Sequence, residues 1–169
     1  MCPPEDRTEL DRLLSLQDTG LLGAPASPGL EDICRTARER FGVPNALVTL
    51  VDREQLRIAA GAADDPSPRS DAFCDHTIRS DDVMVVPDLS LDPRFEQNPL
   101  VVGEPFFRFY AGAPLTYRRG IRLGALCLLD IRPRDFSPGD RAELAELSDQ
   151  VVTLIAQREF EALPGLIAR

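Results

Sequence analysis

Phe107-Arg-Phe-Tyr-Ala-Gly-Ala-Pro-Leu-Thr116 is the stretch that decides the fold. Its odd-numbered positions carry Phe, Ala and Leu, while its even-numbered positions carry Arg, Tyr, Gly, Pro and Thr. This alternation predicts a β-strand with two different faces. A second strand is predicted over residues 121–130. Because only Tyr117-Arg-Arg-Gly120 separates the two, we expect them to pair in antiparallel fashion at the centre of a sheet.

The segments around this pair extend the sheet and cover it. Residues 45–52 are apolar on both faces, and together with residues 56–61 they predict a hairpin inside a covered sheet. One helix is predicted at 30–41, and another at 137–160 begins with the capping-box sequence Ser137-Pro-Gly-Asp140. Shorter elements are predicted between them, a helix at 73–80 and a strand at 84–87. This order predicts an α+β domain in which an antiparallel sheet of about six strands has helices on both faces.

Composition shifts divide the chain into three regions. Residues 1–29 are predicted to form a short N-terminal helix, with Leu10, Leu13 and Leu14 at helical spacing, followed by a linker rich in glycine and proline. Residues 30–162 form the predicted domain, and residues 163–169 form a C-terminal tail.

Charge and composition exclude several classes of function. The formal net charge is -9, and all 19 basic residues are arginines. Such an acidic chain repels nucleic acid and anionic lipid, so neither is expected as a partner. The absence of lysine rules out Schiff-base and phosphate-loop lysine chemistry. No apolar stretch is long enough to span a bilayer, and we expect a cytoplasmic location.

The cysteines predict neither a metal site nor a redox dithiol. The chain has four, none in a C-x-x-C pair: Cys2, Cys34, Cys74 and Cys127. No cofactor is therefore expected. Cys74 stands at the start of a short predicted helix, which favours a reactive thiol, but Asp71 and Asp75 add opposing negative charge. A buried packing role is the alternative for this residue.

Five segments together resemble a known family. They are Phe41-Gly-Val-Pro-Asn-Ala-Leu-Val-Thr-Leu-Val-Asp52, Phe73-Cys-Asp-His-Thr-Ile78, Val86-Pro-Asp-Leu-Ser-Leu-Asp-Pro-Arg-Phe95, Phe107-Arg-Phe-Tyr-Ala-Gly-Ala-Pro-Leu115 and Gly124-Ala-Leu-Cys-Leu-Leu-Asp130. Their order resembles the GAF domain family, and more narrowly the GAF domains found beside bacterial histidine kinases and diguanylate cyclases. The resemblance implies a regulatory module without catalytic activity, with a small-molecule pocket between the sheet and the middle helices.

The resemblance also implies partners. Outer helices of such domains dimerise and pass signals to effectors, so we expect a homodimer through the C-terminal helix. This helix carries two apolar stripes, of which one is expected to cover the sheet and the other to meet the first core helix or a second copy. The resemblance implies an unknown small-molecule ligand. Because the chain ends at Arg169, we expect the signal to pass in trans to a histidine kinase or diguanylate cyclase.

The sequence departs from the family at three points that bear on which ligands it could bind. Leu56 stands where members of the narrower group often have tryptophan. The signature of the cyclic-nucleotide-binding members includes a lysine, which this chain lacks, so cyclic GMP is not expected. Bilin-binding relatives attach the chromophore to a cysteine followed by histidine, whereas Cys74 is followed by Asp75, so no covalent bilin is expected.

The strand face that carries Tyr110 has the mixture of small and polar side chains that a pocket floor needs. The predicted ligand contacts are Phe73, Cys74, His76, Thr77, Asp88, Arg94, Phe95, Arg108 and Tyr110. Structural roles are the alternatives: rim packing for His76, a turn cap for Asp88, and an ion pair of Arg94 with Asp92 or Asp88 in place of an anionic ligand. Two other functions stay open, a redox enzyme of the free-methionine sulfoxide reductase kind and a ligand-free protein-interaction module.

Overall fold

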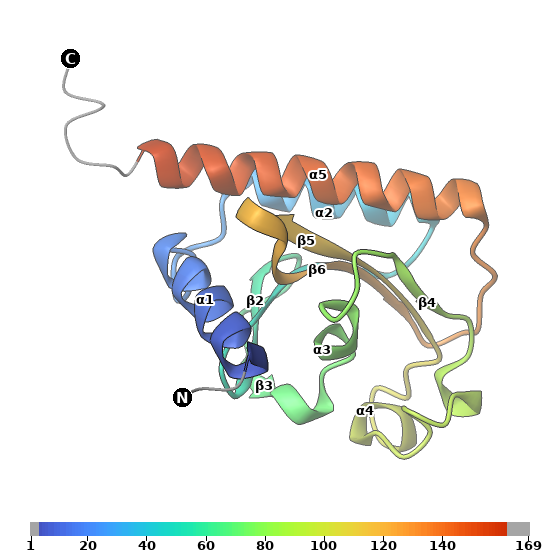
Figure 1. Cartoon of the computed structure of the whole chain (residues 1–169). Helices are drawn as coiled ribbons and strands as arrows, with labels where there is room; N and C mark the ends of the chain where they lie inside the picture. Colours follow the sequence, from blue (N-terminus) through green and yellow to red (C-terminus); the bar gives the residue numbers. More distant parts are fainter. Residues whose placement is uncertain (1–3, 162–169) are drawn as a thin grey trace.

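Six strands form one antiparallel sheet in the computed structural model, which describes residues 4–161 (Figure 1). The strands are β1 Asn45–Val51, β2 Gln55–Ala60, β3 Ser67–Pro68, β4 Met84–Val86, β5 Phe109–Tyr117 and β6 Ile121–Asp130. The helices are α1 Pro4–Asp18, α2 Pro28–Phe41, α3 Cys74–Thr77, α4 Pro99–Val102 and α5 Pro138–Glu161, with 3₁₀ turns η1 Arg69–Asp71, η2 Leu89–Leu91 and η3 Arg118–Gly120. The predicted tail, residues 163–169, lies outside the described residues.

The strand order is β3-β2-β1-β6-β5-β4, so β1 and β6 lie at the centre of the sheet. Helices α2 and α5 cover one face, α3 lies against the other, and α1 packs against β6 (Figure 1). The predicted α+β class, with helices on both faces, is confirmed. One detail differs: β5 is next to the edge of the sheet rather than central. Only the short strand β4, which pairs with it at three positions, lies outside it.

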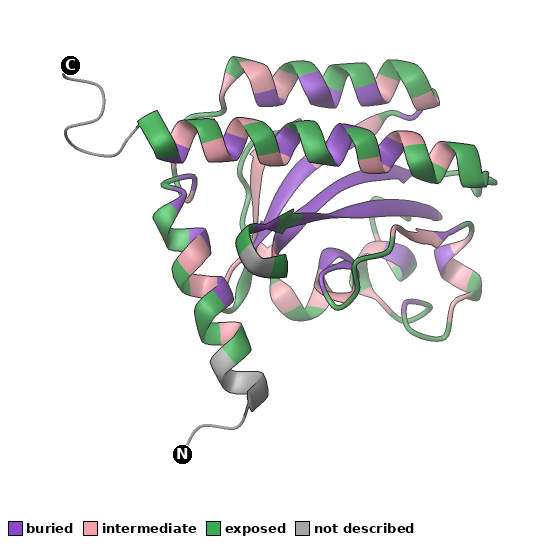
Figure 2. Cartoon of the chain, turned by 45° about the horizontal axis from the view of Figure 1, so that its top comes forward, coloured by how far each residue is buried: buried purple, intermediate pink, exposed green. Residues whose placement is uncertain are grey.

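Alternation along β5 divides the core into two layers. Phe109, Ala111 and Leu115 belong to the layer beneath α2 and α5. Tyr110 belongs to the other layer, together with Cys127 of β6. Both strands are almost wholly buried, as the purple ribbons of Figure 2 show. The pair β5–β6, covered on both sides, thus lies between the two layers of the core.

Helix α5 begins at the predicted capping box. The Ser137 hydroxyl accepts a hydrogen bond from the Asp140 amide at 3.0 Å, and the Ser137 amide donates to the Asp140 carboxylate at 3.0 Å. Leu144 and Val151 are fully buried and face the sheet. Within residues 4–161, no helix combines the length and apolar character needed to cross a membrane. The cytoplasmic location stays a prediction.

Helix α1 packs directly on the sheet. Leu16 is fully buried in the core layer that also contains α2 and α5 residues. Arg12 is 6% exposed, and its guanidinium donates to the carbonyl oxygen of Val51, at the end of β1, at 2.6 Å. The sequence predicted a short N-terminal helix followed by a linker. In the structure, this helix contributes buried side chains to the core of the domain.

Candidate functional site

Tyr110 lies at the centre of the predicted ligand-binding face. Its ring lies over Gly112, two residues further along β5, where a Cβ atom would overlap the ring. The ring also contacts Phe73, with centroids 5.5 Å apart, and the residue is fully buried. The space that the small side chains of this strand leave open is thus occupied by the tyrosine itself.

A buried hydrogen-bond network surrounds the Tyr110 hydroxyl. This hydroxyl lies 2.7 Å from the hydroxyl of Thr77 and donates to Sγ of Cys74 at 3.3 Å. Thr49 of β1 donates to the same sulfur at 3.1 Å, and Cys127 of β6 belongs to the same buried cluster. Burial raises the pKa of Tyr110 well above its ordinary value, so the hydroxyl keeps its proton.

The aromatic residues of the prediction continue this cluster towards the surface. Phe73 and Phe95 meet edge to face, with centroids 5.2 Å apart, and both are buried. His76 packs edge to face on Phe95 at 4.8 Å and is half-buried. Burial, followed by the positive charge of Arg79, lowers the pKa of His76. This matches the rim position that was the alternative for His76.

Three polar residues of the prediction make contacts within the protein. Asp88 caps η2, because its carboxylate accepts from the amide of Ser90 at 3.0 Å. Arg94 forms the alternative ion pair with Asp92 at 2.8 Å and stacks on the Phe95 ring. Arg108 donates to the carbonyl oxygens of Val101 and Phe107, both at 3.0 Å.

The structure therefore brings six of the predicted residues into one packed cluster: Phe73, Cys74, His76, Thr77, Phe95 and Tyr110. Arg94 stacks on Phe95 of this cluster. Asp88 and Arg108 lie beside it and form hydrogen bonds to the backbone of neighbouring turns. A role for these nine residues in ligand binding stays a prediction. Among the described residues, no three His, Cys, Asp or Glu side chains gather in an arrangement that would hold a metal ion.

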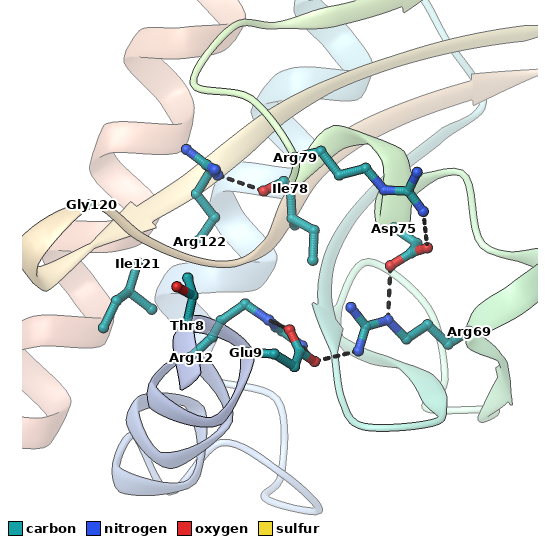
Figure 3. A pocket seen from close by; sticks show the side chains of 10 residues that line it. All are labelled: Thr8, Glu9, Arg12, Arg69, Asp75, Ile78, Arg79, Gly120, Ile121 and Arg122. Atoms are coloured by element: carbon teal, nitrogen blue, oxygen red, sulfur yellow. Dashed lines mark hydrogen bonds and ion pairs between the residues drawn. The ribbon is translucent and has the colours of Figure 1, made fainter. Parts of the chain in front are cut away.

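A cavity of about 610 Å³ lies elsewhere on the same side of the sheet, between α1, α3 and the start of β6 (Figure 3). Its polar lining consists mainly of arginines and carboxylates: Glu9, Arg12, Arg69, Asp75, Arg79 and Arg122. Ile78 and Ile121 supply apolar surface, and Thr8 and Gly120 complete the lining. Sequence reasoning missed this site because its residues come from three segments that are far apart in the chain.

Ion pairs join α1 to the segment before α3 (Figure 3). Glu9 binds Arg12 at 2.9 Å and Arg69 at 2.5 Å, and Arg69 also binds Asp75 at 2.8 Å. Burial raises the pKa of Glu9, but hydrogen bonds from the two arginines outweigh it and bring the pKa down from 4.5 to about 2. The floor of the cavity is thus a fixed network of alternating charges.

The remaining arginines of the lining are less enclosed. Arg79 binds Asp75 at 2.9 Å, and its side chain is 63% exposed. Arg122 binds the carbonyl oxygen of Ile78 and the carboxylate of Asp81, which lies at the surface. One sequence signal could have indicated the site: Arg69 and Arg79 flank the short helix that contains Cys74.

Comparisons with known proteins agree with this fold. The sequence model described as "GAF domain" matches residues 28–155. The GAF domain of a phosphoenolpyruvate-protein phosphotransferase from Acinetobacter superposes with a TM-score of 0.64 at 18% identity, covering 95% of this chain and 98% of that one. A type II free methionine-R-sulfoxide reductase from Thermoplasma acidophilum superposes with a TM-score of 0.59 at 18% identity, over 78% and 89% of the two chains. At these identities the likeness shows the fold alone.

A protein named cyclic di-GMP phosphodiesterase, from Pseudomonas aeruginosa, is 41% identical over 134 residues. The match covers 78% of this chain and 23% of that protein. We expected that the chain is not an enzyme. This relative corrects that expectation, because its name is that of an enzyme. The matched residues 28–155 include every strand of the sheet and most of α5, and this chain belongs to the GAF domain family.

Proposed function

We propose that this GAF domain is the signal-input part of a system that hydrolyses cyclic di-GMP. The observation that carries the proposal is the 41% identity to a segment of the Pseudomonas aeruginosa phosphodiesterase. Identity at this level over 134 residues is far above the 18% found with the two structures that share the fold alone. The proposal assigns the domain an input, a small molecule or a signalling partner, and assigns the output to cyclic di-GMP hydrolysis.

Helix α5 is the element through which we propose that the signal leaves. It is the longest helix, and it packs along β5 and against α2. Glu159, near its end, receives a hydrogen bond from Tyr117 and an ion pair from Arg118, which both adjoin the β5–β6 turn. A shift of that turn would therefore act on the last turns of α5. A histidine kinase or diguanylate cyclase as an additional partner stays a prediction.

A chimera tests this proposal. The segment of the Pseudomonas aeruginosa phosphodiesterase that matches this chain is replaced by residues 4–161 of this chain, which include α1 and Glu159, and cyclic di-GMP hydrolysis is compared with that of a variant lacking the segment. We expect the chimera to hydrolyse cyclic di-GMP at a rate within about threefold of the parent enzyme, and the variant without the segment to differ from both.

The control is the same chimera with Gly124→Val. A Cβ at Gly124 would overlap the backbone carbonyl of Thr49, so this substitution disrupts the pairing of β1 with β6. It should reproduce the rate of the variant lacking the segment. A chimera that behaves like this control would contradict the proposal.

A further inference from the structure

The last turns of α5 carry one buried side chain, and it is a carboxylate. Of residues 156–161, Glu159 alone is buried, at 8% exposed, while Ala156 is half-buried and Phe160 is exposed. A carboxylate at this position is costly, because it loses most of its water and lies near the negative end of the helix dipole. The contacts that neutralise Glu159 therefore decide whether this part of the helix stays on the domain.

Two residues at the β5–β6 turn neutralise Glu159. Tyr117, the last residue of β5, donates its hydroxyl to Oε2 of Glu159, and Arg118, the first residue of η3, forms an ion pair with Oε1 at 3.2 Å. Burial, followed by the hydrogen bond with Glu159, raises the pKa of Tyr117 to about 12, so the phenol keeps its proton and is the donor. The side chain of Arg118 is mostly exposed. One enclosed hydrogen bond and one ion pair screened by water thus hold the carboxylate.

A second flank of these last turns is loosely packed. A hollow of about 240 Å³ lies between the end of α5, the linker after α1 and the start of α2. Arg158 donates to the carbonyl oxygen of Gly20 at 3.5 Å, which is longer than a normal hydrogen bond. Earlier along the helix, Val151 and Ile155 are fully buried in the core. The firm packing of α5 therefore ends at Ile155.

We propose that Glu159 is a latch that releases residues 156–161 of α5 when the β5–β6 turn moves. A displacement of Tyr117 or Arg118 would leave a buried carboxylate without its partners, which is far less stable than the same carboxylate in water. The end of the helix would then leave the sheet, so that Glu159 becomes hydrated. An apolar side chain at this position would pack whatever the turn did, whereas the carboxylate makes attachment depend on the turn.

The β5–β6 turn connects this latch to the cavity between α1 and α3. Gly120 and Arg122 line that cavity, and they follow Arg118 within four residues (Figure 3). Arg122 also binds the carbonyl oxygen of Ile78, at the end of α3. A rearrangement of this cavity wall would therefore move the turn and, through it, the latch. The inference rests on the proposed function, in which α5 is the output, and it names the contact that controls that output.

Hydrogen exchange in the full 169-residue chain, followed by nuclear magnetic resonance at the amides of residues 156–161, tests the latch. Tyr117→Phe keeps the ring but removes the hydroxyl, so the buried Glu159 loses its enclosed donor. We expect these amides to exchange at least about tenfold faster than in the parent chain. Tyr110→Phe is the matched control, because it removes the hydroxyl of the other tyrosine, on the same strand but in the opposite core layer. It should leave the exchange at residues 156–161 unchanged.

A second substitution separates a charge latch from ordinary packing. In the chain with Tyr117→Phe, the change Glu159→Leu removes the buried charge as well, and Arg118 is exposed enough to be hydrated by itself. We expect the exchange at residues 156–161 to return to within about threefold of the parent rate. If Glu159 served only to fill space, the second substitution would add to the damage done by the first.

Three results would overturn the inference. The amides of residues 156–161 exchange in the parent chain as fast as in an unfolded peptide, or Tyr117→Phe exchanges no faster there than Tyr110→Phe, or adding Glu159→Leu restores no protection. The exchange measurement uses this chain alone, whereas the chimera measures hydrolysis. Failure of the latch is therefore distinguishable from failure of the proposed function.

Discussion

Gly112 and Tyr110 occupy the same face of β5, and the ring of the tyrosine fills the space above the glycine. The sequence pattern predicted room on this face, because Gly112 and Pro114 are small. It did not predict that the neighbouring tyrosine would occupy that room, since a pattern of side-chain sizes carries no information on rotamers. The ring direction is set by Phe73 and by the hydroxyl partners on α3.

Substitution of Gly112 tests this packing. Gly112→Ala places a Cβ in overlap with the Tyr110 ring, so we expect the free energy of unfolding to fall by about 1–3 kcal/mol. Tyr110→Leu in the same chain should make the added cost of the alanine smaller. Gly139→Ala, where the Cβ meets only an ordinary contact with Ser137, serves as the control. Denaturant unfolding provides the measurement, and equal costs with and without Tyr110→Leu would disprove the overlap.

The described cysteines should be unreactive in the folded protein. Cys34, Cys74 and Cys127 are at most 2% exposed. In a Cys2→Ser variant, we therefore expect no thiol to react with an aromatic disulfide reagent under native conditions, and three to react after denaturation. A thiol-dependent reductase requires an accessible sulfur, so rapid native labelling of any one of the three would revive that alternative.

At the scale of elements, α1 depends on charge for its attachment. In the folded chain, burial raises the pKa of Glu9, but the hydrogen bonds from Arg12 and Arg69 lower it to about 2, from its ordinary value of 4.5. Because the folded pKa is lowered, its contribution to stability is fully present above pH 4.5 and is lost as the pH falls from there towards 2. The docking of α1 should therefore loosen in acid.

Glu9→Gln tests this pH dependence. The variant should have a lower Tm at neutral pH, because Arg12 and Arg69 lose their shared carboxylate. Its Tm should then fall less steeply than that of the parent between about pH 5 and pH 2. Glu39→Gln removes an exposed carboxylate from α2 and is the control for the general loss of negative charge. Parallel pH profiles for the parent and Glu9→Gln would refute the attachment.

The elements that the sequence predicted best are those with local signals. The capping box at Ser137 and the alternation along β5 both depend on residues within a few positions of each other, and both are present. The arginine cavity depends on Glu9, Arg69 and Arg122, which lie far apart in the chain and are brought together only by the sheet. Sequence reasoning therefore identified the family and the sheet but placed the candidate site on a packed cluster.

At the scale of the whole molecule, we propose a homodimer through α5. Asp149, Gln150 and Thr153 lie exposed on the side of α5 away from the sheet, beside Ile33 of α2. Light scattering at about 50 µM should give twice the monomer mass of 18.6 kDa. Thr153→Arg should shift the mass towards that of the monomer, while Thr36→Arg, on an exposed position of α2, should not. A monomer at this concentration would argue against the dimer.

Control of cyclic di-GMP hydrolysis is the central claim, and the chimera of the Pseudomonas aeruginosa phosphodiesterase tests it most directly. The measurement is the initial rate at which the purified chimera converts cyclic di-GMP to its linear dinucleotide, with and without residues 4–161 of this chain. We predict measurable hydrolysis whose rate changes by at least about threefold when the domain is removed, a change in activation free energy of about 0.7 kcal/mol. The absence of hydrolysis, or an identical rate with and without the domain, would contradict the claim.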